Sequence, residues 1–266
     1  DKIDENGKRS NPYFKPSWNL NLFLSQNYLC HFVTIRKDVL DDYGQFREQC
    51  DGAQDWDNLL HITEQLCDEE IHHIPKILYH WRIHDNSTAK SINVKSNVLA
   101  SSRKALTDYC VRNKIDAKVD VVQEHYFSLN LVLPRKLPLV TVIIPTKNNY
   151  HKLRRCVDSF TNLTNYTNYS LLIVNNESND EDSLNYLDSI CKQHKVINYT
   201  KPFNHSEINN FAVSKNQSDL YLFLNDDTEI IEPNWLTEMV QCSLFDQIGI
   251  VGCKLLYPSL KVQHAG

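Results

Sequence analysis

Apolar positions follow two different rhythms on either side of a proline-bounded segment at residues 134–138. After that segment, short apolar runs alternate with stretches in which apolar residues recur at helical spacing. The first run, residues 139–144, is apolar except for Thr141 and ends at Pro145, which is typical of a strand buried on both faces. The pattern predicts strands at residues 139–144, 170–174, 196–199, 220–224 and 248–253, and helices at about residues 150–163, 182–193, 208–215 and 234–245. This alternation predicts an α/β fold with a parallel sheet covered by helices on both faces.

The first half of the chain mixes shorter elements and predicts an α+β arrangement. Its pattern predicts a strand at residues 28–35, a helix at 53–65, an extended segment at 71–83, an amphipathic helix at 91–112, and two strands within residues 119–131. Pro134 and Pro138 enclose a short basic run and mark the clearest boundary. We therefore expect three parts: residues 1–115, connecting strands and a linker at 116–138, and residues 139–266.

Composition excludes several classes of protein. The hydrophobic content of 41% and the charged content of 23% are ordinary for a globular domain. A net charge of −5 argues against a nucleic-acid partner, which usually needs a basic face. The eight cysteines form no C-x-x-C pair, so a thiolate zinc site is not expected. Reduced, buried cysteines fit a cytoplasmic protein, and no run approaches the roughly 18 apolar residues of a transmembrane helix.

Polar clusters follow the predicted strands of the second half. They lie at residues 145–149, 175–178 and 225–229, and ligands of parallel sheets bind beyond the carboxyl ends of the strands. Asp226 and Asp227 are adjacent carboxylates, which repel one another unless a cation lies between them. Oxygen ligands suit Mg²⁺ or Mn²⁺. The alternative is that Asp226, Asp227 and Thr228 only precede and cap a helix.

Several segments of the second half occur in the order found in one enzyme family. They are VIIPTKN at 142–148, LRRCVDS at 153–159, IVNNES at 173–178, PFNHSEINNFA at 202–212, LFLNDDTE at 222–229, LLYP at 255–258 and QHAG at 263–266. On these motifs residues 139–266 resemble the nucleotide-sugar-binding half of an inverting family 2 glycosyltransferase. That resemblance implies a GT-A (Rossmann-like) fold. The set of motifs resembles that of the multi-module transferases that build rhamnose-containing and O-antigen polysaccharides.

The resemblance also implies roles for the residues at the strand ends. It places Pro145 and Thr146 at the border of the nucleotide pocket and Asn175 and Asn176 against the base and ribose. The motif at 202–212 adds Asn209 and Asn210 to the nucleotide-binding set. Two departures from the family pattern put nucleotide affinity in question. Asn175 replaces an Asp, which removes an acceptor-only group, and Glu177 replaces a glycine that eases a turn.

For the metal, the resemblance implies Mn²⁺ or Mg²⁺ bound at Asn225-Asp226-Asp227, the family's DXD signature, with Asp227 as its best-matched ligand. A divalent cation there would neutralise the charge that builds on the leaving nucleotide. The family usually has an Asp at the position of Asn225.

The first half resembles the acceptor-binding end of the same kind of module. Its segments, again in family order, are DKID at 1–4, PYFKP at 12–16, LSQNYLC at 24–30, YGQFR at 43–47, DGAQDWD at 51–57, HIPKILYHWRIH at 73–84 and STA at 87–89. The resemblance implies that Asp55 is the catalytic base and that Asp57 supports it by hydrogen bonding. It also places His84 at the position where the family has a metal-binding imidazole. The alternative for Asp55 is a first-turn carboxylate favoured by the helix dipole.

The base precedes the nucleotide-binding strands, whereas a complete module has the opposite order. We therefore expect an internal fragment that carries parts of two neighbouring modules; a single permuted module is the alternative. The resemblance implies transfer of a sugar from a nucleotide-diphosphate sugar to a growing cell-surface polysaccharide. The acceptor would be a glycan or a lipid-linked glycan, which allows peripheral association with the inner membrane face. A catalytically silent nucleotide- or carbohydrate-binding module and a structural connector are the rival functions.

Overall fold

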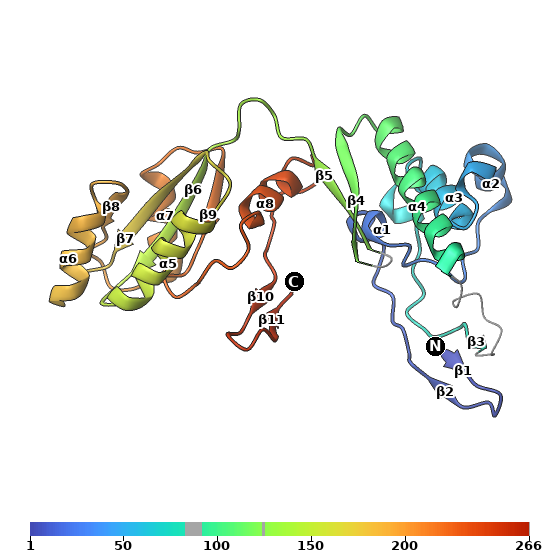
Figure 1. Cartoon of the computed structure of the whole chain (residues 1–266), viewed down its shortest axis with the longest axis horizontal. Coiled ribbons are helices and arrows are strands. Elements are labelled where there is room, and N and C mark those ends of the chain that lie inside the picture. Colours follow the sequence, from blue (N-terminus) through green and yellow to red (C-terminus); the bar gives the residue numbers. More distant parts are fainter. Residues whose placement is uncertain (83–91, 124–125, 266) are drawn as a thin grey trace. The chain divides into compact units, whose positions relative to one another are not determined.

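The computed structural model describes residues 1–82, 92–123 and 126–265 (Figure 1). The chain divides into two compact units, Asp1–Val132 and Leu133–Gly266. Each unit has its own hydrophobic core. Within the described residues, no helix is both long enough and apolar enough to cross a membrane.

A four-stranded parallel sheet is the centre of the second unit. Its strands are β6 (Val140–Thr146), β7 (Tyr169–Asn175), β8 (Lys195–Asn198) and β9 (Leu220–Phe223), in the order β8-β7-β6-β9. All three strand pairs are parallel. The predicted α/β fold of this half is therefore confirmed. The central strand β6 pairs with β7 along its whole length but with β9 only from Val140 to Ile143.

Helices cover both faces of this sheet, as the alternating pattern predicted. They are α5 (Tyr150–Leu163), α6 (Glu181–Ile190), α7 (His205–Ser214) and α8 (Trp235–Ser243). Along β6 the side chains alternate between the faces. Val142 and Ile144 pack in the cluster that contains residues of α5, α6 and α8, whereas Ile143 packs with residues of α7. Figure 1 shows these helices around the strands.

The strand predicted at residues 248–253 is wrong. That segment has no regular structure, and Ile250 is 93% exposed. The run contains Gly249 and Gly252, which weaken a strand because they offer no side chain for packing. A short antiparallel pair follows it instead, formed by β10 (Leu255–Leu256) and β11 (Val262–His264).

The first unit packs helices against a two-stranded antiparallel ribbon. Its helices are α1 (Leu20–Ser25), α2 (Lys37–Tyr43), α3 (Gln54–Thr63) and α4 (Ile92–Arg112), with 3₁₀ turns at Glu48–Cys50 and Asp68–Glu70. The ribbon is β4 (Ala117–Gln123) with β5 (Tyr126–Leu131), and a small sheet joins β1 (Lys2–Ile3), β2 (Arg9–Ser10) and β3 (Trp81–Arg82). Trp56 lies at the centre of the core, with ring centroids 6.2 Å from Phe23 and 5.6 Å from Phe127.

The strand predicted at residues 28–35 is also wrong. Phe32 and Val33 are exposed, so this apolar run does not face a core. The carbonyl oxygens of Leu29 and His31 accept hydrogen bonds from the Lys15 ammonium group rather than from a neighbouring strand. Of the extended segment predicted at 71–83, only β3 forms a strand among the residues that the structure describes.

Candidate functional site

Three polar residues meet at the carboxyl edge of the parallel sheet. Thr146 is the last residue of β6, and its carbonyl oxygen accepts a hydrogen bond of 2.9 Å from the Asn176 N–H, directly after β7. The Thr146 hydroxyl donates to Oδ2 of Asp226, in the segment after β9, at 2.7 Å. The structure therefore brings together groups from the ends of three strands, at the place where parallel sheets bind ligands.

The amide groups of Asn175 and Asn176 are almost entirely buried and hold neighbouring backbone. Oδ1 of Asn175 accepts from the Ser178 N–H at 2.9 Å, and its Nδ2 donates to Asn198 Oδ1 at 3.0 Å. Nδ2 of Asn176 donates to the carbonyl oxygens of Tyr199 and Lys201, at 3.1 and 3.0 Å. Oδ1 of Asn176 is buried and has no hydrogen-bond partner in the described part of the chain, a condition that costs about 1–3 kcal/mol unless a ligand satisfies it.

The turn after β7 requires a left-handed residue, and Glu177 provides it with a φ of 57°. Glycine adopts this region most readily, so the structure explains why a glycine suits the position. Asn148, at a φ of 50°, ties the turn to the end of β6. Its N–H donates to Ser178 Oγ at 3.0 Å, and its Oδ1 accepts from the Asn179 N–H at 2.7 Å.

A cavity of about 250 Å³ lies beside the end of β8. Its lining includes Asn210, whereas Asn209 is absent from the lining. Nδ2 of Asn209 instead donates to the His205 carbonyl at 2.8 Å, within α7. The Tyr199 hydroxyl donates to Glu207 at 2.7 Å on one side of the cavity. The full lining is Asn198, Tyr199, Thr200, Lys201, Glu207, Asn210 and Phe211.

Pro145 lies in the part of β6 where a proline costs no hydrogen bond to the neighbouring strand β9. It pairs with Val174 of β7, but β9 has ended before this position. A missing N–H therefore removes no sheet hydrogen bond to β9.

The acidic segment after β9 does not cap a helix, so the capping alternative is wrong. The next helix, α8, begins at Trp235. Asp226 is half-buried and held by Thr146, whereas the Asp227 side chain is 53% exposed with Lys152 Nζ 3.7 Å away. In the described part of the chain, no three His, Cys, Asp or Glu side chains form a metal-binding group. Two carboxylates fit a divalent cation that takes its other ligands from a diphosphate.

Cys156 lies under this segment and is not a nucleophile. Its Sγ is 3.6 Å from the Asn225 carbonyl oxygen, and its side chain is fully buried. Burial, with smaller contributions from the charges of Asp226 and Asp227, raises the pKa of the thiol to about 12. The sulfur therefore stays protonated at neutral pH and supports the segment by packing.

In the first unit, Asp55 lies in the first turn of α3. The helix has no side-chain cap at Ala53, so its N-terminal N–H groups lack that partner. Asp55 is half-buried, and its Oδ2 accepts a hydrogen bond of 2.9 Å from Asn27 Nδ2. Asp55 is therefore not sealed from solvent, which a general base requires.

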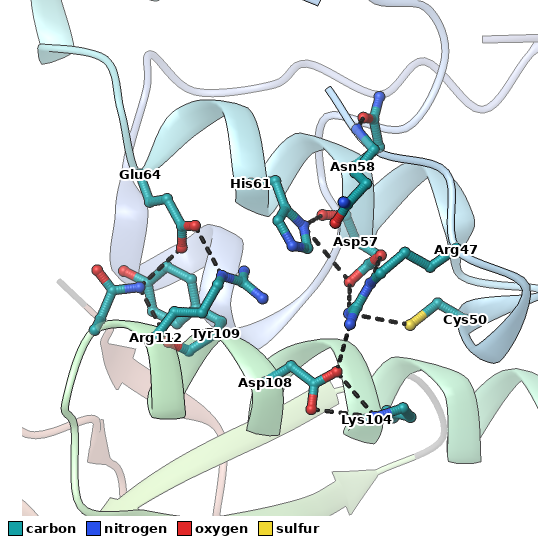
Figure 2. A network of polar contacts seen from close by, with 12 residues as sticks. Arg47, Cys50, Asp57, Asn58, His61, Glu64, Lys104, Asp108, Tyr109 and Arg112 are labelled. Carbon is teal, nitrogen blue, oxygen red and sulfur yellow. Dashed lines mark hydrogen bonds and ion pairs between the residues drawn. The ribbon is translucent and has the colours of Figure 1, made fainter. Parts of the chain in front are cut away.

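Asp57 has no exposed surface and belongs to a polar network between α3 and α4 (Figure 2). Arg47 binds it with two nitrogens, Nε to Oδ2 at 2.8 Å and Nη2 to Oδ1 at 2.5 Å. Arg47 Nη1 also donates to Asp108 of α4 at 2.8 Å. These bonds raise the pKa of Arg47 above its usual value. Burial acts to raise the pKa of Asp108, but bonds from Lys104 and Arg47 lower it overall.

The geometry gives Asp57 a supporting position, since no substrate reaches a carboxylate that is fully buried and doubly bonded. Arg47 and Asp108 were not singled out from the sequence. The motif YGQFR at 43–47 contains Arg47, but its partners lie 10 and 61 residues away. His84, expected at a metal ligand, lies outside the described residues.

The sequence of residues 141–263 matches the family described as glycosyl transferase family 2. This stretch is a glycosyl transferase family 2 domain. It contains the sheet, the Thr146–Asp226 contact and the cavity beside β8. The whole chain is 37% identical to the "Uncharacterized protein y4gI" of Sinorhizobium fredii and 34% identical to the "O-antigen biosynthesis protein RfbC" of Myxococcus xanthus. It spans 30% and 21% of the lengths of these two proteins.

Two solved structures are similar to this chain at low scores. One is the mannosyltransferase PcManGT from Pyrobaculum calidifontis in complex with GDP-Man and Mn²⁺, with 18% identity, a TM-score of 0.43, and coverage of 57% of this chain and 44% of that one. The other is residues 1–349 of TarS from S. aureus, with 18% identity, a TM-score of 0.33, and coverage of 37% and 30%.

Proposed function

We propose that this chain is a section of a glycosyltransferase that moves a sugar from a nucleotide-diphosphate sugar to a growing polysaccharide. The meeting of Thr146, Asn176 and Asp226 at the carboxyl edge of the sheet carries the proposal. The family 2 domain supports the reaction class, and a relative named for O-antigen biosynthesis supports a polysaccharide product. In this proposal the domain has the GT-A fold.

The nucleotide would lie along the edge from β6 to β8. Asn176 offers a buried carbonyl oxygen there that has no hydrogen-bond partner among the described residues, and Asn210 lines the adjacent cavity. Pro145, Thr146 and Asn175 would form the wall at the ends of β6 and β7. Asn209 donates within its own helix through its amide nitrogen, while its Oδ1, like that of Asn176, is buried without a partner among the described residues.

Asp226 and Asp227 would hold Mn²⁺ or Mg²⁺, which supplies positive charge to the leaving diphosphate when bound. The two residues differ in what they are free to do. Thr146 fixes the orientation of Asp226, whereas Asp227, with Lys152 Nζ 3.7 Å away, would give up that weak pair to bind the cation. We also propose His84 as a metal ligand of the module to which the first unit belongs, in line with the family motif.

Asp55 would act as the general base for an inverting transfer. It takes the proton from the acceptor hydroxyl while the hydroxyl oxygen attacks the sugar carbon in line and the nucleoside diphosphate leaves. A positioned base of this kind contributes about 10²–10⁴ in rate. Asp57 and Arg47 hold the helix that presents it. Asp55 would serve a different donor site from that of the second unit, because the base precedes the nucleotide-binding strands in the chain.

A catalytically silent nucleotide-binding domain is the second candidate. Two observations favour it. The amide of Asn175 is already bonded at both ends, and Glu177 occupies the left-handed position that suits a glycine. Such a domain would bind a nucleotide without transferring a sugar.

The first experiment measures nucleotide binding by calorimetry. Uridine, thymidine and guanosine diphosphates are each titrated into the chain with and without Mn²⁺. We expect one of them to bind in a Mn²⁺-dependent way, and Asp227→Ala to abolish that binding. The exposed Glu232→Ala is the matched control, because it removes an acid from the same segment outside the proposed site. Equal binding by Asp227→Ala and the unchanged chain would refute the metal assignment.

The second experiment tests transfer in the longer protein that contains this chain. If the two units belong to different modules, Asp55→Asn and Asp227→Ala should each abolish one linkage of the product and spare another. Loss of the same linkage in both variants would favour a single permuted site. Full transfer by Asp227→Ala, with nucleotide binding lost, would favour the silent domain.

A further inference from the structure

Four aromatic rings form a cluster on the surface of the first unit. His31 lies 5.3 Å from Tyr79 and 6.0 Å from Trp81, and Phe32 lies 5.9 Å from Tyr79, measured between ring centroids. The three large rings are exposed: Phe32 by 57%, Tyr79 by 38% and Trp81 by 51%. A contiguous exposed aromatic patch often marks a binding site, whereas single exposed apolar residues are normal on a protein surface.

A chain of contacts connects this aromatic cluster to Asp55. Asn27 donates through Nδ2 to Asp55, and its Oδ1 accepts from the Cys30 N–H at 3.2 Å. The next residue, His31, belongs to the cluster, and its carbonyl oxygen accepts from Lys15 Nζ at 2.7 Å. The loop that carries two of the four rings is therefore fixed to the carboxylate that we propose as the base.

We propose that the aromatic cluster His31, Phe32, Tyr79 and Trp81 binds the acceptor glycan, with its sugar rings stacked on the exposed aromatic faces. The proposal rests on Asp55 as the base, because the acceptor hydroxyl must lie beside it. A sugar ring has apolar C–H faces and a rim of hydroxyls. Aromatic rings with polar edges match both, since Tyr, Trp and His present an apolar face and a polar tip.

Charge argues against an anionic lipid surface as the occupant. Such a surface is bound by clusters of Lys and Arg, whereas this chain has a net charge of −5. Lys15, which contacts the loop at His31, already donates to two backbone carbonyls. Lys2 is paired with Trp81 in the register of β1 and β3, so a single lysine rather than a basic cluster lies beside that ring in the strand pairing. A neutral, hydroxyl-rich ligand fits the cluster better than an anionic one.

The test measures binding of neutral oligosaccharides to the whole chain by saturation-transfer NMR. The probes are gluco-, manno- and rhamno-oligosaccharides, added without nucleotide. We expect at least one series to bind, with transfer concentrated on ring C–H protons. Trp81→Ala and Tyr79→Ala should each weaken that binding about tenfold, the order expected for loss of one stacked ring with its buried area.

Phe46→Ala is the matched control, because Phe46 is a 69% exposed aromatic of the same unit outside the cluster. Its glycan affinity should equal that of the unchanged chain, and circular dichroism should show all variants folded. Asp55→Asn should retain glycan binding while it loses transfer in the longer protein. Mn²⁺-dependent nucleotide binding, measured on the same samples, separates failure of this inference from failure of the proposed donor site.

Three results would overturn the inference. The first is the absence of binding by every oligosaccharide series, and the second is equal binding by Trp81→Ala and the unchanged chain. The third is a change of sedimentation in Trp81→Ala without a change in glycan affinity, which would make the cluster a contact between copies of the chain.

Discussion

In the second unit, Asp227 lies exposed after β9 with its nearest ammonium group 3.7 Å away; in the first unit, Asp57 is fully buried and bonded twice by Arg47. Both aspartates belong to motifs that the resemblance linked to the same reaction, glycosyl transfer. Their surroundings separate their roles. A carboxylate that is weakly paired and exposed is available to a ligand, whereas a buried and bidentate one stabilises the fold.

The largest effect should come from breaking the buried pair. Asp57→Ala leaves the Arg47 charge without its main partner and should destabilise the first unit by about 3–5 kcal/mol. Urea unfolding followed by tryptophan fluorescence measures this, because three of the four tryptophans belong to this unit.

The comparison supplies two controls for that measurement. Asp227→Ala should change stability by less than about 0.5 kcal/mol, since it is exposed. Replacing both partners, Arg47→Met with Asp57→Leu, should cost much less than Asp57→Ala alone. Equal losses in Asp57→Ala and Asp227→Ala would contradict the division between a structural and a ligand-binding aspartate.

A smaller effect concerns pH. The pKa of Asp108 is lowered in the folded chain, so its contribution is present above the unfolded pKa of about 3.9. That contribution should be lost as the pH falls through the still lower folded pKa. Asp108→Asn should therefore flatten the acid side of the stability curve of the first unit. An unchanged acid limb in this variant would show that the Arg47 bridge to α4 adds nothing.

The smallest effect should come from the turn after β7. Glu177→Gly removes a left-handed non-glycine residue and should stabilise the second unit by about 0.5–1 kcal/mol. Glu177→Val, with a branched side chain at the same φ, should destabilise it. Thermal unfolding of the second unit measures both. If nucleotide affinity rises in Glu177→Gly, the turn also limits ligand binding; a loss of stability would show that the Glu177 side chain has a role of its own.

Much of the second unit could be predicted because its signals are local. The helix predicted at 150–163 is α5 without change, since its apolar residues recur on one face and Leu153, Cys156, Val157 and Phe160 are buried. The strands β6, β7, β8 and β9 also lie, within a residue or two, where short and mainly apolar runs predicted them.

The features that the sequence did not predict share a physical cause: a local pattern does not show which distant residues will contact it. Residues 28–35 look like a strand, but a lysine binds two of their carbonyl groups. The Arg47 bridge joins residues from three separated segments, so no window of sequence contains it. The roles of Asp55, Asp226 and Asp227 remain proposals, since shared motifs suggested them and only binding and transfer can test them.

The unequal lengths of β6 and β9 have a consequence for how this domain can change. The last hydrogen bond between them joins the Leu224 N–H to the Ile143 carbonyl, and β6 continues past it through Pro145 to Thr146. Beyond Leu224 the segment is held to β6 by a side chain, through the hydrogen bond from the Thr146 hydroxyl to Asp226, rather than by the strand ladder. Insertions or deletions between Thr228 and α8 would change the surface beside Asp226 and Asp227 without breaking a ladder bond of the sheet. If these two aspartates hold the cation as we propose, sequence drift there would alter the donor site while the sheet folds as before.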